Sequence, residues 1–153
     1  EDALGPANPN WPDARYADLR HPAWRTTRIE EVIPAVLARG YDGIFIDTVD
    51  NAEAMELADA RAARGMVAAA AALIVAVRAR FPGIRIMLNR GYAAVPASAR
   101  AVDILLGEAM ASRWNFAAKR YEATSADDWA WQAARLREAA ALNPALTLAT
   151  LDY

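Results

Sequence analysis

The chain has 153 residues, of which 56% are hydrophobic and 24% are charged, and its formal net charge is −2. This length suits one core of ordinary size, and the balanced charge gives no basic surface for nucleic acid. The absence of cysteine excludes a disulfide framework, a zinc–thiolate site and a cysteine nucleophile.

Two further features limit the classes of protein that the sequence fits. His21 is the only histidine, so a Ser-His-Asp triad or a multi-histidine metal site would have to be built around it. The longest apolar run, Met66–Val77, is too short to span a membrane and predicts a buried helix. The chain starts without methionine or a signal-peptide pattern and ends in a buried-strand pattern at Thr147–Tyr153. We therefore expect an internal segment of a longer protein, for which a missing targeting signal carries no weight.

The first 40 residues predict turns followed by a helix. Residues 1–25 are rich in proline and asparagine, which favour turns and extended backbone, and Arg15–Leu19 fits a short strand. Apolar residues recur at helical spacing over Thr27–Arg39, where Thr27 and Glu30 fit a capping box. Pro34 lies inside this pattern and predicts a bend. His21 precedes the helix and is expected at the surface or as a cap.

The middle of the chain predicts two buried strands separated by a helix. Gly43–Asp47 is continuously apolar up to its last residue, as is typical of a parallel strand covered on both faces. Asn51–Arg64 predicts a loop with a short helix, and Gly65–Phe81 predicts a helix that ends at a Pro-Gly pair. Ile84–Leu88 is the next apolar strand.

The rest of the chain continues the alternation. Ala97–Val102 predicts a short helix, Ile104–Gly107 a strand, Ser125–Leu142 a helix with a capping signature at its start, and Leu146–Leu151 the last strand. Alternating strands and helices indicate right-handed βαβ units and a parallel sheet. The pattern by itself leaves an open doubly wound sheet and a (β/α)₈ barrel as alternatives.

Chemically useful side chains follow all four confident strands. In parallel α/β folds the carboxyl ends of the strands face one side, and that side holds the active site. We therefore expect these side chains to meet at one rim. They are Asp47 with Asp50, Asn89-Arg90-Gly91-Tyr92, Glu108, and Asp152-Tyr153.

Structural roles compete with the functional ones at several of these positions. Asp50 and Asp152 fit a turn or a helix N-cap about as well as a substrate contact, and Arg90 fits a structural ion pair equally well. Glu108 is the exception, because glutamate is a poor turn former and a poor N-cap. This makes Glu108 and Asp47 the strongest candidates for chemistry.

The segment Gly40–Asp50, GYDGIFIDTVD, resembles the signature G-[FY]-D-G-[IV]-F-[IL]-D-T-[VL]-D of glycoside hydrolase family 114, the endo-α-1,4-polygalactosaminidase family. Other segments fit this family in the same order. These are Asn8-Pro9-Asn10-Trp11-Pro12 with Asp18, Leu88-Asn89-Arg90-Gly91, Gly107-Glu108 and Leu151-Asp152-Tyr153. The resemblance covers almost the whole chain.

The resemblance implies an α/β fold that is part of a (β/α)₈ barrel. A complete barrel takes about 250 residues. Residues 1–153 would then be one incomplete barrel domain with roughly strands three to seven. The first two strands and the eighth would come from the rest of the full-length protein.

The resemblance also implies a retaining glycosidase with one aspartate and one glutamate. These would be Asp47 as nucleophile and Glu108 as acid/base, although the sequence alone permits the reverse roles. Enzymes of this kind hold the two carboxyl groups about 5–5.5 Å apart. The substrate would be an amino-sugar polysaccharide and no cofactor would be needed. A secreted or cell-envelope location would suit the family.

The remaining site candidates would bind substrate. Asp50 and Asp152 offer carboxylates, and Asn89 and Arg90 offer polar groups that orient or balance the catalytic pair. Trp11, Tyr92, Trp114 and Tyr153 offer flat apolar rings on which sugars stack. Trp24, Trp129 and Trp131 fit helix packing better.

Two other classes of function remain open at this stage. Asp47, Asp50 and Glu108 are oxygen ligands that would suit Mg²⁺ in a metal-dependent barrel hydrolase or lyase. The chain would alternatively be a carbohydrate-binding barrel without catalysis, although its two candidate acids speak against that.

Overall fold

The computed structural model describes residues 3–8 and 11–153, so Pro9 and Asn10 of the expected N-terminal loop motif lie outside the described residues. Its strands are β1 (Leu4–Asn8), β2 (Trp11–Ala17), β3 (Gly43–Ile46), β4 (Arg85–Asn89), β5 (Ile104–Glu108), β6 (Ser112–Asn115), β7 (Arg120–Ala123) and β8 (Thr147–Leu151). Its helices are α1 (Pro22–Thr27), the π-helical turn η1 (Arg28–Val32), α2 (Ile33–Leu37), α3 (Asn51–Ala58), α4 (Met66–Arg80), α5 (Val95–Ser98), the 3₁₀ turn η2 (Ala99–Ala101) and α6 (Ala126–Leu142).

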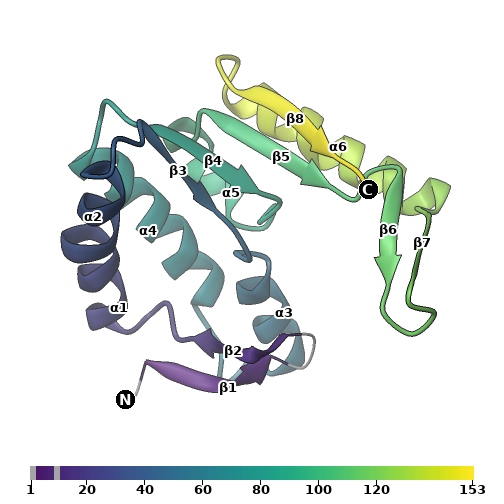
Figure 1. Ribbon diagram of the computed structural model, residues 1–153, viewed down its shortest axis with the longest axis horizontal. Helices are drawn as coiled ribbons and strands as arrows, with labels where there is room; N and C mark the ends of the chain where they lie inside the picture. Colours follow the sequence, from purple (N-terminus) through teal and green to yellow (C-terminus); the bar gives the residue numbers. More distant parts are fainter. Residues whose placement is uncertain (1–2, 9–10) are drawn as a thin grey trace.

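A four-stranded parallel sheet forms the centre of the molecule (Figure 1). Its order is β3-β4-β5-β8, so consecutive strands of the sheet are neighbours and helices connect them. This confirms the α/β fold class that the sequence pattern predicts.

Strands β3 and β4 approach each other closely at Gly43, where a Cβ atom would lie 2.6 Å from the carbonyl oxygen of Arg85. The second glycine of the signature segment is therefore required by the approach of β3 to β4.

The core lies between the sheet and the helices that cover it. Ile86 and Leu88 of β4 are fully buried, and Leu105 of β5 is almost so. Ile74 and Met66 of α4 are each 1% exposed, which makes α4 the central covering helix. Burial on this scale explains why these segments read as continuous apolar runs.

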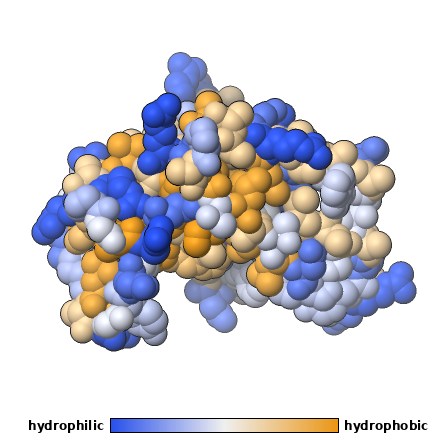
Figure 2. Space-filling view, turned by 90° about the horizontal axis from the view of Figure 1, so that it is seen from above, coloured by the Kyte–Doolittle hydropathy of each residue, from blue (hydrophilic) through white to orange (hydrophobic). Residues whose placement is uncertain are grey.

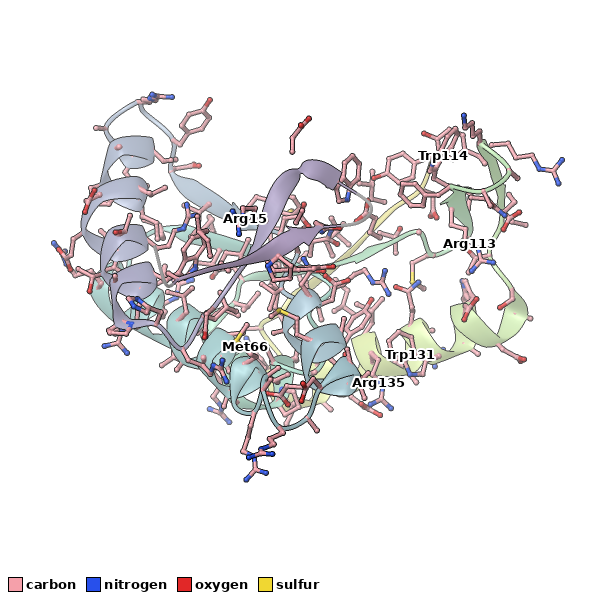
Figure 3. All side chains as sticks on the ribbon, turned by 90° about the horizontal axis from the view of Figure 1, so that it is seen from below. Arg15, Met66, Arg113, Trp114, Trp131 and Arg135 are labelled. Atoms are coloured by element: carbon pink, nitrogen blue, oxygen red, sulfur yellow. The ribbon has the colours of Figure 1, made fainter. Side chains whose placement is uncertain are left out.

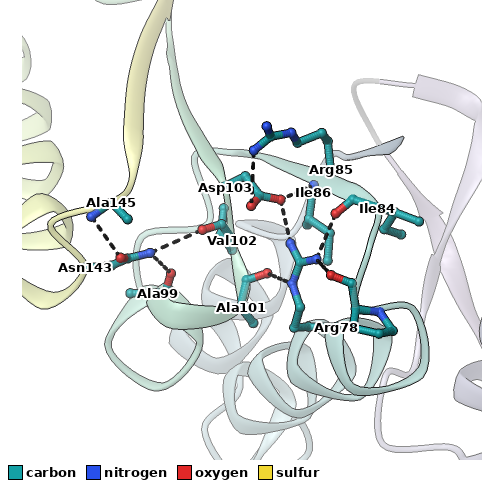
Figure 4. A network of polar contacts seen from close by, with 11 residues as sticks. Arg78, Ile84, Arg85, Ile86, Ala99, Ala101, Val102, Asp103, Asn143 and Ala145 are labelled. Carbon is teal, nitrogen blue, oxygen red and sulfur yellow. Dashed lines mark hydrogen bonds and ion pairs between the residues drawn. The ribbon is translucent and has the colours of Figure 1, made fainter. Parts of the chain in front are cut away.

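A polar network connects α4 with the amino-terminal ends of β4 and β5 (Figure 4). Asp103, directly before β5, accepts hydrogen bonds from the backbone N–H of Ile86 at 2.7 Å and from Arg78 at 2.5 Å. Arg78 also donates to the carbonyl oxygens of Ala101 and Ile84. These contacts join α4, β4 and β5 at the end of the sheet opposite the candidate site. Polar residues at that end of such folds serve stability.

The first helical segment begins earlier than the sequence predicts. It runs from Pro22 through η1 to Leu37, and His21 is the N-cap, accepting a hydrogen bond from the N–H of Ala23 at 3.3 Å. The predicted capping box at Thr27 is wrong, because Thr27 has helical backbone angles and its side chain makes no capping bond. Further along the segment, Pro34 lacks an N–H, and it stands in the first turn of α2 directly after the π-helical turn. The missing N–H is tolerated there because the first turn of a helix leaves its N–H groups without partners inside the helix.

Two antiparallel hairpins stand outside the parallel sheet, β1 with β2 and β6 with β7. The strand expected at Arg15–Leu19 falls partly in β2, which pairs with β1 and not with the parallel sheet. The sequence pattern does not predict the second hairpin. It interrupts the alternation between β5 and α6, and Figure 1 shows it projecting beside the end of β8.

The two outer strands of the sheet, β3 and β8, carry exposed apolar side chains. Phe45 on β3 is 53% exposed, and Leu148 and Leu151 on β8 are about 40% exposed. Next to β3, an apolar cavity of about 840 Å³ lies between the helical segment 22–37, β3 and α4. Figure 2 shows hydrophobic residues exposed near the middle of one face of the molecule, with hydrophilic residues around them. Within the described residues, no helix is long and apolar enough to cross a membrane.

Candidate active site

Three polar side chains meet where three neighbouring strands end. Asp47 directly follows β3, Asn89 is the last residue of β4, and Glu108 is the last residue of β5. Parallel pairing of β3 with β4 and of β4 with β5 brings these ends to one rim of the sheet. Asn89 lies between the two acids and is only 6% exposed.

The amide of Asn89 joins the two carboxylates. Its Nδ2 donates to Asp47 Oδ1 at 2.9 Å and to Glu108 Oε2 at 2.6 Å. Both bonds leave the same nitrogen, so these oxygens are separated at most by the two bonds laid end to end, about 5.5 Å. The Oδ1 atom of Asn89 is buried and accepts no hydrogen bond from the described residues. The amide therefore acts as a donor bridge between two acids.

Each acid has one further donor. The N–H of Thr48 donates to Asp47 Oδ1 at 2.8 Å, so both hydrogen bonds to Asp47 end on the same oxygen and Oδ2 accepts none from the described residues. The Tyr153 hydroxyl donates to Glu108 Oε1. This hydrogen bond is the main cause that raises the pKa of Tyr153 to about 12. Tyr153 therefore keeps its proton at any ordinary pH.

The backbone turns sharply after each of the three site residues. Thr48, Arg90 and Ala109 have φ angles of 59°, 51° and 57°, in the left-handed region that residues with a side chain rarely occupy. Each follows directly after Asp47, Asn89 or Glu108. Strained backbone of this kind gathers at functional sites, where the surrounding fold enforces it. Here it lets the chain leave the strand at once, with the functional side chain at the rim.

A cleft of about 1110 Å³ lies over this rim. Its lining contains most of the residues that the sequence singles out: Trp11, Asp47, Asp50, Asn89, Arg90, Glu108, Trp114 and Tyr153. The carboxylate of Asp50 makes no hydrogen bond or ion pair with the described residues, although its backbone carbonyl accepts a bond from the N–H of Ala54. The Nε atom of Arg90 is buried and has no hydrogen-bond partner among the described residues. Charged residues of both signs therefore line the cleft.

Tyr92 is not brought into the cleft. It is 7% exposed, and burial raises the pKa of its hydroxyl to about 12. The hydroxyl donates to Gln132 Oε1 at 3.0 Å, and Gln132 Nε2 donates to the carbonyl oxygen of Ala109 at 3.2 Å. Tyr92 also packs edge-on against Trp131 at 5.5 Å between ring centroids. Its contacts support the strained turn after Glu108 rather than a sugar ring.

Asp152 also lies outside the cleft lining. Its Oδ1 accepts hydrogen bonds from the N–H groups of Ala111 and Ser112, at 2.6 and 3.0 Å. These bonds fasten the end of β8 to the start of β6. The carboxylate is a turn former, which is the structural alternative that the sequence left open.

Several cleft residues were not singled out from the sequence. Tyr121 and Phe116 come from the β6–β7 hairpin, Arg15 from β2, and Gln132 from α6. Figure 3 shows Trp114 and Arg113 on that hairpin, Trp131 on α6 and Arg15 on the opposite side. The only sequence signal for this hairpin is the pair of aromatic residues, Trp114 and Tyr121, on either side of its turn. Among the described residues, no group of three or more His, Asp or Glu side chains is arranged to hold a metal ion.

Comparisons with known proteins show the fold and the family of the chain. Two solved structures superpose on the chain with a TM-score of 0.84, those of the glycoside hydrolase domain of PelA from Pseudomonas aeruginosa and of a single-site variant of it. They are 24% and 22% identical to the chain, which covers 58% of each of them while 99% of its own length is matched. By its fold the chain is thus part of a (β/α)₈ barrel.

The family follows from the sequence match. The model of glycoside-hydrolase family GH114 matches residues 1–128, and the chain belongs to that family. A search of curated proteins found no match.

Proposed function

We propose that the protein containing this chain is a glycosidase that cleaves an amino-sugar polysaccharide, as in endo-α-1,4-polygalactosaminidases, with retention of configuration. The observation that carries the proposal is the pair of acids bridged by Asn89, with acceptor oxygens at most about 5.5 Å apart. Retaining enzymes hold their carboxyl groups about 5–5.5 Å apart, whereas inverting enzymes need about 6.5–9.5 Å for a water molecule.

In the first step, Asp47 attacks the anomeric carbon through Oδ2, the oxygen that accepts no hydrogen bond from the described residues. The bond from that carbon to the leaving oxygen breaks, and Glu108 gives its proton to the leaving oxygen. The product is an ester between the sugar and Asp47. Two N–H donors on Oδ1 hold the attacking carboxylate in position.

In the second step, Glu108 takes a proton from water, and the oxygen of that water attacks the anomeric carbon. The ester breaks and Asp47 returns as a carboxylate. Tyr153 suits both protonation states of Glu108, because a phenol hydroxyl both donates and accepts hydrogen bonds. Asn89 remains a donor to both acids throughout.

The amino-sugar part of the proposal rests on the free carboxylate of Asp50. Asp50 lines the cleft, and its carboxylate makes no hydrogen bond or ion pair with the described residues, so it is available to a protonated amine of the substrate. Arg113 adds little opposing charge, because Glu122 and Asp128 pair with it at 3.3 and 3.4 Å. The cleft lining carries four acids against three arginines: Asp47, Asp50, Glu108 and Asp128 against Arg15, Arg90 and Arg113. This small excess of acidic groups favours a cationic polymer over a neutral one.

We also propose that residues 1–153 are one incomplete barrel domain that is completed by the rest of the protein. The support is the length covered, 58% of the PelA domain, together with the exposed apolar side chains on β3 and β8. The experiments below therefore use the full-length protein.

The test of catalysis is turnover of α-1,4-linked galactosamine polymer, measured as the release of new reducing ends. Asp47→Asn and Glu108→Gln are each expected to lower kcat by at least about 100-fold, since each removes a group that bonds or transfers a proton. Asp127→Asn and Glu138→Gln are matched controls on exposed positions of α6 and should retain full turnover. Full turnover in either site variant would contradict the assignment.

The test of substrate class compares this polymer with its N-acetylated form. The free-amine polymer should be cleaved with the higher kcat/KM, and Asp50→Asn should reduce that preference. An equal kcat/KM for both polymers, unchanged by Asp50→Asn, would remove the amino-sugar proposal and leave the glycosidase.

A further inference from the structure

The β6–β7 hairpin has two faces of opposite chemistry. Arg113 and Glu122 are paired across its strands on one face, and Asn115 donates to Glu122 Oε2 at 3.0 Å. Arg113 also reaches Asp128 at the start of α6. This polar face anchors the hairpin to the body of the molecule.

The other face is aromatic. Trp114 and Tyr121 are directly opposite each other in the register, so their side chains lie on the same face. Their ring centroids are 4.9 Å apart, and the ring of Tyr121 stacks on that of Tyr153 at 5.7 Å and 18°. Tyr153 in turn donates to Glu108. A continuous series of ring contacts therefore leads from the hairpin to the candidate acid/base.

These rings are left uncovered. Trp114, Tyr121 and Tyr153 are 40%, 54% and 55% exposed, and all three line the cleft. Large aromatic surfaces in a row on a cleft wall indicate a binding site, because single exposed rings are ordinary but a joined row is not. Figure 3 shows Trp114 on the hairpin, at the right of the view.

We propose that Trp114, Tyr121 and Tyr153 form an aromatic ledge that binds the sugar units on the leaving-group side of the cleaved bond. The inference rests on the proposed function, because it takes Glu108 as the group that protonates the leaving oxygen. A ledge that starts at the partner of Glu108 lies beside the sugar that departs. The occupant is a glycan chain, since its rings present flat apolar faces to the aromatic rings and its hydroxyls point to the open cleft.

The ledge predicts a dependence on chain length. A short sugar that fills only the positions next to the acids does not reach Trp114 at the far end of the series. A longer chain does, and it gains affinity from that ring. Trp114 is thus a specificity-determining residue for polymer over short oligosaccharide.

The experiment measures binding of galactosamine oligosaccharides, from dimers to octamers, to the full-length Glu108→Gln protein by calorimetry. Adding Trp114→Ala or Tyr121→Ala should weaken octamer binding roughly tenfold, the loss expected for one aromatic contact, and leave dimer binding nearly unchanged. Trp114→Phe should restore most of the octamer affinity. Trp129→Ala, an exposed tryptophan of α6 outside the cleft lining, is the matched control and should have no effect.

The outcomes separate the ledge from the proposed function. Length-dependent binding that Trp114→Ala abolishes, in a protein that hydrolyses no polymer, would support the ledge as a glycan-binding surface and overturn both the glycosidase and the assignment of the ledge to the leaving-group side. Hydrolysis by the wild type, with equal octamer affinity in Trp114→Ala and its parent, would overturn the ledge alone. A lower Tm in Trp114→Ala with unchanged binding would also overturn it, because the ring would then be covered by protein. No binding of any oligosaccharide would overturn both.

Discussion

The parallel sheet and the β6–β7 hairpin contribute to the same cleft by different physical means. The sheet places Asn89 and Glu108 at the ends of β4 and β5, whose residues Leu88 and Leu105 are buried in the core. Asp47 follows β3 and is joined to them through Asn89, so separating the two acids would disturb both the hydrogen bonds and the packing. The hairpin buries little, and its aromatic face stays open. Rigid placement suits the reacting groups, whereas an exposed hairpin with few buried contacts suits binding of a long substrate.

The comparison predicts that changes in the sheet lower the stability of the whole domain, while changes at the hairpin loosen the hairpin alone. The expected effects on the free energy of unfolding decrease from the sheet to the hairpin.

The largest effect is expected at Leu88, which is fully buried in β4. Leu88→Ala should lower the free energy of unfolding by about 2–5 kcal/mol, because it leaves a cavity in a packed core. The measurement is urea denaturation of the full-length protein. Leu57→Ala is the matched control, since Leu57 is 81% exposed and should change stability by no more than about 0.5 kcal/mol. Similar losses at the two positions would contradict the placement of the core.

A smaller loss is expected at Asp103. Asp103→Ala leaves the N–H of Ile86 and the guanidinium of Arg78 without their acceptor, which should cost about 1–3 kcal/mol. Turnover should change little, because Asp103 lies at the opposite end of the sheet. The same denaturation series measures it, with Asp127→Ala as the exposed control. A loss of turnover without a loss of stability would show that this network serves the site directly.

A loss of about 1 kcal/mol is expected at Asp152, by analogy with the loss of a capping side chain. Asp152→Ala frees the N–H groups of Ala111 and Ser112, which the carboxylate holds. Hydrogen exchange should accelerate in β6 and β7 and stay unchanged in β4. Asp152→Asn retains an acceptor oxygen and should behave nearly as the wild type. Faster exchange throughout the parallel sheet would contradict the independence of the hairpin.

The smallest effect is a loosening of the hairpin in acid. Hydrogen bonds from Asn115 and Arg113 hold the pKa of Glu122 below its ordinary value of 4.5. The stabilisation is therefore present above pH 4.5 and is lost as the pH falls through the lower value of the folded state. Amide exchange, corrected for its intrinsic pH dependence, should show the hairpin opening more readily below pH 4.5. Glu122→Gln should remove this dependence, and a hairpin equally protected at all pH values would contradict it.

The sequence predicts the sheet well because its two central strands, β4 and β5, are buried and its strands are rich in apolar residues. A serine cap marks the start of α6. The sequence fails where local chemistry is unusual. His21 is not a common N-cap residue, so the true start of the first helical segment is hidden.

The β6–β7 hairpin was missed for a related reason. Its strands are four residues each. One face of the hairpin is polar and the other is aromatic but exposed, so neither face shows the buried apolar pattern that marks a strand. Its register depends on pairing between the two strands, and its position depends on the ion pair between Arg113 and Asp128 of α6. Sequence spacing reveals neither.

The candidate site divides in the same way. Strand-end position is enough to predict that Asp47, Asn89 and Glu108 meet. It does not reveal that Asn89 donates to both acids or that Tyr153 bonds to Glu108, since these contacts depend on side-chain directions set by three strained backbone turns. It also does not separate Tyr92 and Asp152, which support neighbouring turns, from residues that face the cleft.

The most direct test of the central claim is the configuration of the first product. Two acids bridged by one amide fit the close carboxyl spacing of retaining enzymes, so the account predicts a double displacement. Proton NMR recorded immediately after the full-length enzyme is mixed with α-linked galactosamine polymer should show the α-anomer forming first and mutarotating later. Initial formation of the β-anomer would mean single displacement by water and would contradict the assignment of Asp47 as nucleophile.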